Sequence, residues 1–301
     1  MIDNWQFGTR SDERRVRAYK LRSDLGFEAV ILDQGATLQS FCLPNGQNIT
    51  LGYDDWESYE NDVNYKGRVI GPNANRIANA RFEIAAQKHF LKANDGLHNL
   101  HSGPTGFDRE IWQTSPTDSG LKLELESPEA RHGFPGTIRA TLKISLIENI
   151  LRLEMEATST RPTPMNLTWH PYWNLSSGAR IDGHNLEVSA ETYTILNAST
   201  AFPVKHTLRD FTRETPLGSV PLDCNYKDMK FARLTAGRTT MTLTSSLSDL
   251  QVYTGETLSQ PRAGIALEPQ FRPNDINFAQ YSLLRPSEVY GHWIEYRFDL
   301  R

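Results

Sequence analysis

The sequence contains little cysteine, no excess of basic residues and no long apolar run. Its two cysteines, Cys42 and Cys224, are too few for a disulfide framework and are most simply small hydrophobic residues in a reduced compartment. Lys and Arg number 32 against 36 Asp and Glu, so a nucleic-acid partner is not expected. Met1–Arg22 is polar, and no stretch suits a signal peptide or a membrane span. These absences favour a cytoplasmic protein without a membrane partner.

Helical patterns and common catalytic motifs are also scarce. The sequence holds no phosphate-binding glycine loop, no nucleophile elbow and no paired thiol and histidine. Short stretches such as Leu51–Glu60 are long enough for only a turn or two of helix. No linker, internal repeat or low-complexity tract divides the chain, so residues 1–301 are expected to form a single domain.

Alternation of apolar and polar residues is the dominant pattern. Every second residue of Ile138–Leu146 is apolar, and the pattern resumes in Leu151–Ala157, which predicts a hairpin of two half-buried antiparallel strands. Further strands are predicted at residues 81–84, 88–91, 121–126, 239–244, 250–253 and 293–298. Many strands without alternating helices predict an all-β fold, in which two large antiparallel sheets pack face to face as a sandwich.

Asn166–Leu175 places a histidine within an aromatic, strand-forming run. On an extended strand through residues 166–172, His170 and Tyr172 share a polar face, while Trp169 and Trp173 point the other way, toward an apolar layer. The polar face is then expected to line a groove. A histidine that is merely hydrogen-bonded at the surface of a sheet explains the same pattern, because histidine is intermediate in burial.

A carboxylate follows a second apolar strand. Glu268 comes directly after Ile265–Leu267, so the strand is expected to deliver it near a loop, where partial desolvation raises its basicity and suits a general base. An ordinary glutamate at a strand end is the simpler alternative. Together with His170, however, Glu268 forms a proton acceptor and donor pair on rigid strands, which indicates a sugar-processing enzyme.

Other polar residues are candidates for binding a sugar. Arg76 follows Asn75 in the Gly/Asn/Ala-rich segment Gly67–Ala80, and its planar guanidinium can bind adjacent oxygens, although a surface arginine explains it too. Asp223 and Gln251 lie beside aromatic residues, a mixture that suits saccharides, whose hydroxyls need directional partners and whose C–H faces rest on rings. Each of these signals is weak by itself.

His98 and His101 have a spacing that two metal ligands on a helix would show. Gly96 before them and Ser102–Pro104 after them indicate a turn instead. No nearby cysteine or H-E-x-x-H pattern supplies further ligands, so no metal site is expected. His101 alone is better explained as a hydrogen-bonding group for a ligand.

The order of several short motifs resembles the aldose 1-epimerase (galactose mutarotase) family over most of the chain. The matching segments are Gly35–Leu38, Gly67–Gly71, Ala74–Ala78, Leu100–Trp112, His132–Gly136, Asn166–Leu175, Leu250–Gly255 and Gly264–Gln270. One such motif is weak, but their common order makes the resemblance specific. The chain departs from the family pattern at Pro72, Ser102, Trp173 and Phe202–Lys205, around the rim of the expected groove.

The resemblance implies a large antiparallel β-sandwich of the galactose mutarotase-like type with a carbohydrate groove. It implies that Glu268 is the general base and His170 the general acid. The residues that match positions for holding sugar hydroxyls are Asn75, Arg76, His101, Tyr172, Asp223 and Gln251. The implied activity is interconversion of the α and β anomers of a free aldose, a monosaccharide substrate, without a metal or other cofactor.

In the expected mechanism, Glu268 is ionised and His170 is protonated in the free enzyme. Three other functions are compatible with the sequence. A carbohydrate-binding or sensing protein would keep the groove without turnover, and a β-sandwich glycosidase or lyase would use Glu268 and Asp223. A hexose-6-phosphate epimerase would need basic groups over the phosphate, for which the candidates are Arg68, Arg109 and Arg272. The preferred aldose, the oligomeric state and the pathway stay open.

Overall fold

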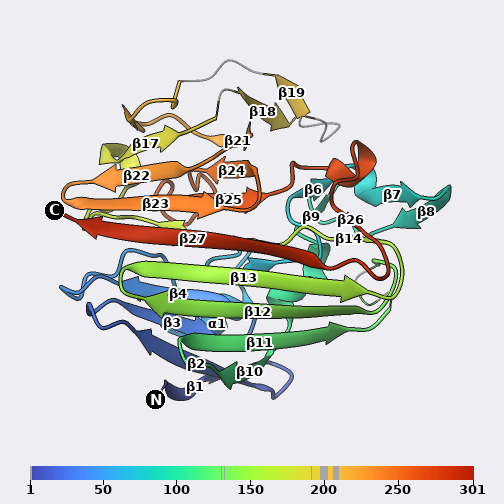
Figure 1. Cartoon of the computed structure of the whole chain (residues 1–301), viewed down its shortest axis with the longest axis horizontal. Helices are drawn as coiled ribbons and strands as arrows, with labels where there is room; N and C mark the ends of the chain where they lie inside the picture. The colour runs from blue at the N-terminus through green and yellow to red at the C-terminus, as the bar shows by residue number, and fades with distance from the viewer. Residues whose placement is uncertain (1, 130, 132, 191, 197–202, 206–209) are drawn as a thin grey trace.

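The computed structural model describes residues 2–129, 131, 133–190, 192–196, 203–205 and 210–301, and strands dominate them (Figure 1). His132 and Phe202, from two of the segments named above, lie outside the described residues. The short helix α1 (Trp56–Glu60) falls within the predicted stretch. The 3-10 helices are η1 (Ala78–Ala80), η2 (Gly103–Thr105), η3 (Phe107–Arg109), η4 (Ile181–Gly183) and η5 (Asp275–Asn277). Among the described residues, no helix is both long enough and apolar enough to span a membrane.

The largest sheet among the described residues has nine antiparallel strands and forms one layer of the protein (Figure 1). Its order is β10 (Gln113–Pro116), β11 (Gly120–Ser127), β12 (Ile138–Ile147), β13 (Ile150–Ser159), β27 (Tyr290–Leu300), β23 (Thr239–Ser245), β22 (Ala232–Ala236), β17 (Asn185–Val188) and β20 (Thr215–Pro216). β27, which comes late in the sequence, pairs with both β13 and β23 and joins two halves of the sheet.

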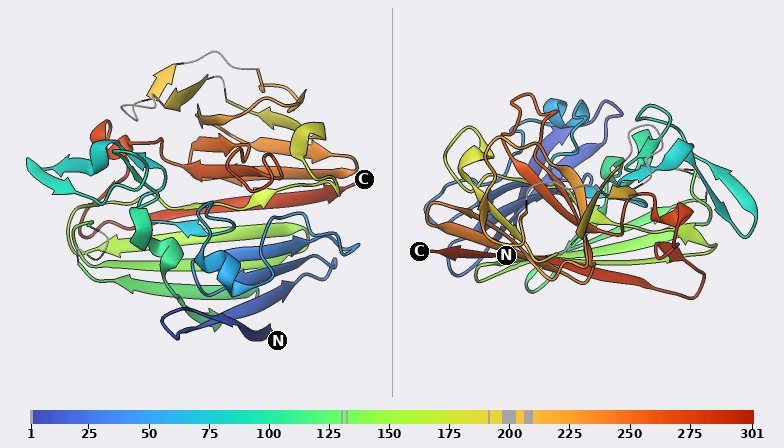
Figure 2. Two further views of the ribbon diagram at one scale, coloured as in Figure 1. Left: turned by 180° about the vertical axis from the view of Figure 1, so that it is seen from behind. Right: turned by 90° about the horizontal axis from the view of Figure 1, so that it is seen from above.

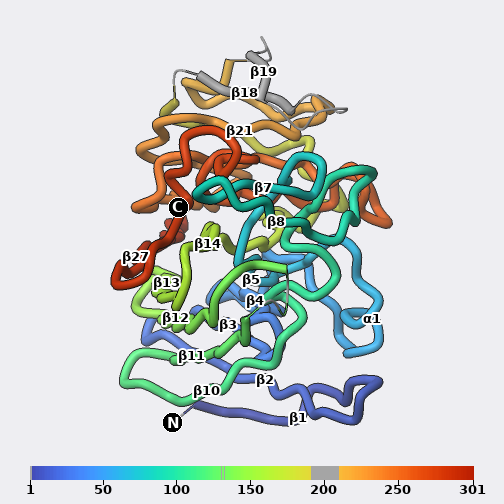
Figure 3. Tube along the Cα trace, turned by 90° about the vertical axis from the view of Figure 1, so that its right-hand side faces the viewer, coloured from blue at the N-terminus to red at the C-terminus, as the bar shows by residue number. Residues whose placement is uncertain are grey.

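Two smaller sheets lie on the other side of this layer (Figure 2, Figure 3). One has the order β16 (Tyr172–Trp173), β25 (Ile265–Gln270), β24 (Asp249–Tyr253), β21 (Asp223–Lys227), β18 (Thr192–Leu196) and β19 (Pro203–Lys205), and the other the order β1 (Asp3–Thr9), β2 (Arg15–Arg22), β3 (Glu28–Leu32) and β4 (Thr37–Cys42). Separate strand pairs are β14 (Thr163–Pro164) with β26 (Leu283–Leu284), β15 (Thr168–Trp169) with β5 (Val69–Ile70), β6 (Arg76–Ile77) with β9 (Asn99–Leu100), and β7 (Arg81–Ile84) with β8 (Gln87–Phe90). The predicted all-β sandwich is confirmed.

The alternation in the sequence explains which strand faces are buried. In β12, Ile138, Leu142 and Leu146 are buried, whereas Arg139 and Lys143 on the opposite face are exposed. β12 pairs with β13 in the predicted hairpin. The other predicted strand ranges overlap β7, β8, β11, β23, β24 and β27. Side chains on the inner faces of the layers form the main hydrophobic core.

Aromatic residues connect the two layers at the place where they support β16. The rings of Phe41 and Phe298 stack with their centroids 4.3 Å apart, and the ring of Trp173 lies 4.9 Å from that of Tyr296. Trp173 is fully buried in this cluster. Because side chains alternate along an extended chain, anchoring Trp173 in the core turns Tyr172 toward the opposite side.

Replacing Trp173 by Ala is expected to lower the free energy of unfolding by about 3–5 kcal/mol, because it leaves a large cavity between the layers. Urea unfolding followed by circular dichroism measures this loss. Trp5→Ala is the control, since Trp5 on β1 is 41% exposed and its replacement should change the free energy of unfolding by about 0.5 kcal/mol or less. Equal losses in the two variants would contradict the packing described.

Candidate active site

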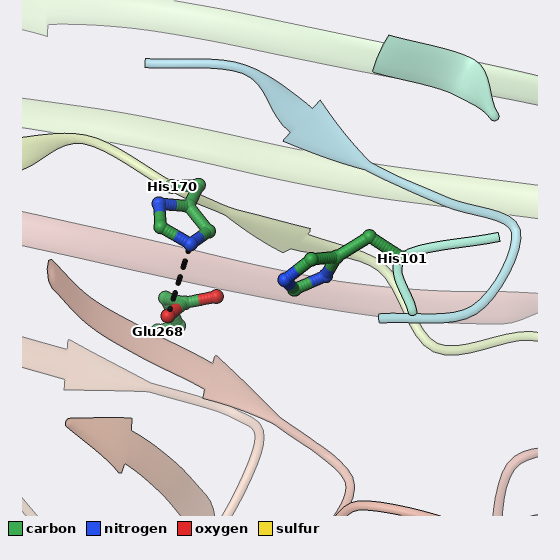
Figure 4. A group of neighbouring side chains, drawn as sticks. All are labelled: His101, His170 and Glu268. Atoms are coloured by element: carbon green, nitrogen blue, oxygen red, sulfur yellow. Dashed lines mark ion pairs between the residues drawn. The ribbon is translucent and has the colours of Figure 1, made fainter. Parts of the chain in front are cut away.

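Two segments that are distant in the sequence bring His170 and Glu268 together. On β25, Leu267 packs in the core, and Glu268, the next residue, faces the other way. His170 lies between β15 and β16. Its Nε2 atom is 3.4 Å from Oε1 of Glu268 (Figure 4). A histidine and a carboxyl group on core-anchored strands thus form a direct pair.

The position of Glu268 differs from the prediction that it follows a strand. Glu268 lies inside β25, which continues to Gln270 and pairs Pro269 with Leu250 of β24. On the other side, β16 pairs only with residues 265–266, so among the described strands Pro269 has a ladder partner on one side alone. A proline is tolerated within a strand under that condition, because it has no N–H to donate.

The strand expected through residues 166–172 is also interrupted. It forms two short strands, β15 and β16, separated by His170 and Pro171. Pro171 cannot donate to a ladder, which favours a break at this point. The backbone of His170 is nevertheless fixed, since its N–H donates to the carbonyl of Arg68 at 2.9 Å and its carbonyl accepts from the N–H of Gly67 at 3.0 Å.

Burial determines whether His170 or Glu268 carries the proton that the two side chains share. His170 is 4% and Glu268 1% exposed. Burial raises the pKa of Glu268 well above its usual value, and the negative charge of Asp223 adds to this effect. Burial also lowers the pKa of His170 to about 4. In the unliganded protein a neutral carboxyl group beside a neutral imidazole is therefore favoured, in contrast to the ionised pair that the sequence led us to expect.

His101 is held as a neutral hydrogen-bond donor. Its Nδ1 atom accepts a hydrogen bond of 3.1 Å from the backbone N–H of Asn75. An accepting Nδ1 in a neutral imidazole requires that Nε2 carries the hydrogen. Burial lowers the pKa of His101 well below its usual value, and positive charge on His170 and Arg76 would lower it further. His101 can therefore offer an N–H group to a ligand.

The same side chains have the composition of a metal site. The potential ligand atoms of His101, His170 and Glu268 all lie within 4.8 Å of one another. A metal-bound histidine, however, donates its other ring N–H to an oxygen, whereas Nδ1 of His101 accepts a hydrogen bond from Asn75. The bond to Asn75 would have to break before Nε2 of His101 could bind a metal. This donor set fits a ligand with hydroxyl groups better than a cation.

Arg76 on β6 lies beside two carboxylates. Its Nε atom is 2.6 Å from Oδ2 of Asp95, and its Nη1 atom is 3.9 Å from Oδ2 of Asp223. Oδ1 of Asp223 accepts a hydrogen bond of 2.7 Å from Nε2 of Gln251 on β24. These contacts connect β6, β21 and β24 around one polar centre.

All eight residues predicted for the site line one cavity of about 640 Å³. Small-molecule sites occupy roughly 300–1,000 Å³. In the described part of the chain, Oε1 of Gln251 and Oε2 of Glu268 are buried without a hydrogen-bond partner, so a ligand with several hydroxyls would satisfy them. The structure brings the eight residues together, and their roles in binding and catalysis stay predictions.

The cavity is also lined by residues that were not predicted from the sequence. The ring of Tyr65 lies 4.6 Å from that of His101, and Tyr253 and Asp95 line the same space. Tyr253 could have been found, because it is two residues after Gln251 on β24 and shares its face. Tyr65 and Asp95 lie in irregular segments, where no periodic signal applies.

The sequence is similar to known epimerases over nearly its whole length. Galactose mutarotase of Mus musculus is 28% identical over 324 residues, which cover 95% of this chain and 94% of that protein. Aldose 1-epimerase of Escherichia coli strain K12 is 28% identical over 334 residues, which cover 95% of this chain and 96% of that protein.

Solved structures share the fold. The galactose 1-epimerase from Lactobacillus acidophilus NCFM matches with a TM-score of 0.90 and 23% identity over 100% of this chain and 99% of that one. The GalM/aldose epimerase homologue from C. elegans matches with a TM-score of 0.88 and 24% identity over 94% and 98% of the two chains. The sequence profile of the aldose 1-epimerase family matches residues 17–297, and the protein therefore belongs to that family.

Proposed function

We propose that this protein is an aldose 1-epimerase, a mutarotase that interconverts the α and β anomers of a free aldose, and that residues 1–301 act as one domain. The main support for this proposal is that His170 Nε2 lies 3.4 Å from Glu268 Oε1 inside a cavity lined with hydrogen-bonding groups. The family match and the relatives named galactose mutarotase and aldose 1-epimerase support the proposal.

The reaction needs a proton removed from the anomeric hydroxyl and a proton delivered to the ring oxygen. Glu268 takes the first and His170 supplies the second, so the ring opens to the aldehyde. After rotation about C1–C2, the two transfers run backward and close the other anomer. Protons are conserved over the cycle, and each transfer by a positioned group is worth roughly 10²–10⁴-fold in rate.

The resting pair holds the one proton that this mechanism requires. Burial favours that proton on Glu268, and the catalytic form places it on His170, across the 3.4 Å between Oε1 and Nε2. A hydroxyl group that donates to Glu268 and a sugar oxygen that accepts from His170 each stabilise the charged form of that side chain, which favours the ionised pair. Substrate binding thus prepares the pair for ring opening.

A neutral sugar suits the charges of the cavity. Among its described lining residues, Arg76 is the single Lys or Arg, and the acidic ones besides Glu268 are Asp95, Asp223 and Glu256. Two of these acids already lie beside the guanidinium of Arg76. A phosphate would meet net negative charge here, so the hexose-6-phosphate alternative is disfavoured.

The arginines considered for a phosphate site lie elsewhere. Nη1 of Arg68 is 3.3 Å and Nε of Arg109 is 3.1 Å from Oδ2 of the buried Asp108. Nε of Arg272 is instead 3.5 Å from Oδ1 of Asp275. None of the three belongs to the described residues that line the cavity. They stabilise loops of the fold and form no phosphate clamp.

Glu268→Gln and His170→Asn are each expected to lower kcat by about 10²–10⁴-fold with the fold unchanged, because each removes one proton-transfer group. Polarimetry on freshly dissolved α-galactose and α-glucose measures the rate. Glu83→Gln, on the exposed face of β7, serves as the control and should keep wild-type activity. Near-wild-type rates in either site variant would overturn the assignment, and sugar binding without turnover in the wild type would favour the sensing alternative.

The pH profile of kcat/KM should be broad. The pair keeps a single proton from the pKa of His170, about 4, up to the raised pKa of Glu268. Activity should fall on the acid side only near pH 4, where His170 binds a second proton while Glu268 is still protonated. It should persist as the pH rises past ~6.5, the usual pKa of histidine. Rates corrected for spontaneous mutarotation test this, and an alkaline limb centred near ~6.5 would contradict it.

Activity should survive removal of metal ions, because Nδ1 of His101 accepts a hydrogen bond, so that Nε2 carries a hydrogen and this cavity-lining side chain is a donor. Dialysis against EDTA followed by polarimetry in metal-free buffer is expected to leave kcat and KM within error of the untreated protein. Loss of activity that returns on addition of Zn²⁺ would show that the three side chains bind a metal in the working enzyme.

A further inference from the structure

Asp95 has the shortest ion-pair distance to Arg76 in the cavity and has no role in the mechanism above. Oδ2 of its carboxylate is 2.6 Å from Nε of Arg76. We propose that Asp95 is a substrate-positioning residue that orients the guanidinium of Arg76 toward adjacent hydroxyl groups of the sugar. This inference rests on the proposed function, because it assigns how the same site holds its neutral substrate.

The planar geometry of the guanidinium explains how Asp95 can orient Arg76. The group is planar and has five N–H donors in a fixed fork, so a bond at Nε determines the direction of the two Nη groups. Asp95 occupies Nε, and Asp223 lies 3.9 Å from Nη1. Arg76 lines the cavity with 25% of its side chain exposed. The Nη donors that Asp95 does not occupy are therefore available to the ligand.

Asp95 is itself held in place by a closed turn. The N–H of His98 donates to the carbonyl of Asp95 at 2.9 Å, and the N–H of Asp95 donates to the carbonyl of His98 at 3.2 Å. Gly96 adopts a φ of +58°, which glycine reaches without strain. Nδ1 of His98 accepts the N–H of Asn79 at 3.2 Å and docks the turn onto the segment after β6.

A second anchor ties the turn to the strand opposite Arg76. The side-chain amide of Asn94 accepts from the N–H of Leu100 at 2.7 Å and donates to its carbonyl at 3.0 Å. Leu100 on β9 pairs directly with Arg76 on β6, and His101 follows it. These contacts hold the turn next to the guanidinium of Arg76 and the donor group of His101, and the three are called one unit below. The backbone of the turn fixes where the carboxylate of Asp95 lies.

The charges of this unit suit a vicinal diol. A hydroxyl group both donates and accepts, so two adjacent hydroxyls can accept from the Nη donors of Arg76 while one of them donates to Oδ2 of Asp223, whose Oδ1 already accepts from Gln251. The two carboxylates leave an excess of negative charge around the guanidinium. The unit therefore selects a neutral sugar with unmodified hydroxyls and disfavours one with an anionic substituent at that edge.

A purely structural ion pair is the alternative. Arg14 and Asp12 form one at 2.7 Å on the surface, with both side chains at least 42% exposed and neither residue lining the cavity. Such exposed pairs contribute little to stability. Asp12 also lies 3.2 Å from Nε of Arg10. Asp12→Asn is a control, because it removes the same kind of carboxylate from arginines that do not line the cavity.

The experiment measures KM and kcat by polarimetry with α-galactose and α-glucose for Asp95→Asn, Asp95→Ala and Asp12→Asn. Loss of a charge-assisted bond that orients the binding group should raise KM about tenfold or more in Asp95→Ala. kcat should stay within about threefold, because the proton-transfer pair is intact. Asp95→Asn should raise KM less, since its amide oxygen can still accept from Nε of Arg76. Asp12→Asn should match the wild type.

A double-mutant cycle with Arg76→Lys separates positioning from general weakening. Lysine keeps the charge but has no planar fork, so Asp95→Ala should change KM by less than about threefold in that background. KM unchanged by both Asp95 substitutions, or equal effects of Asp95→Ala with and without Arg76, would overturn the proposal. If the wild type binds sugar without accelerating mutarotation, the proposed function fails, and calorimetric affinities in the same variants still test Asp95.

Discussion

The site depends on the burial of one acid–base pair on strands that the core holds in place. His170 and Glu268 are removed from water, so ionisation of either side chain is unfavourable unless the other carries the opposite charge. The pair therefore shares a single proton, and its energy depends on what else enters the cavity. The neighbouring groups are consistent with this constraint. His101 is a neutral donor, and the charge of Arg76 is offset by adjacent carboxylates.

Much of the fold could be predicted because alternation is a local property. Apolar residues at every second position predict the hairpin of β12 and β13. The same pattern predicts that the side chain of His170 points away from the core that contains Trp169. The composition of the site followed from the motifs of the family resemblance, and those segments do meet at one cavity. Pairing of distant strands, such as β27 with β13, has no comparable local signal.

The remaining features arise from contacts between segments that are far apart in the chain. Complete burial of Glu268 requires the surrounding sheets, so its proton could not be assigned from Ile265–Leu267 alone. Asp95 reads as an ordinary turn residue until the docking of its turn places it on Arg76. Arg68 and Arg109 looked available for a phosphate until the fold placed both on the buried Asp108.

The placement of β27 has a consequence for how the protein is made. β10–β13 leave the ribosome early and β22–β23 later, but neither group can complete the nine-stranded sheet, because the strand between them is synthesised after both. A nascent chain that ends before Tyr290 exposes the unpaired edges of β13 and β23, which are sites for pairing with other chains. Assembly of the sheet is therefore a late event, and chaperone protection during synthesis would matter most in that interval.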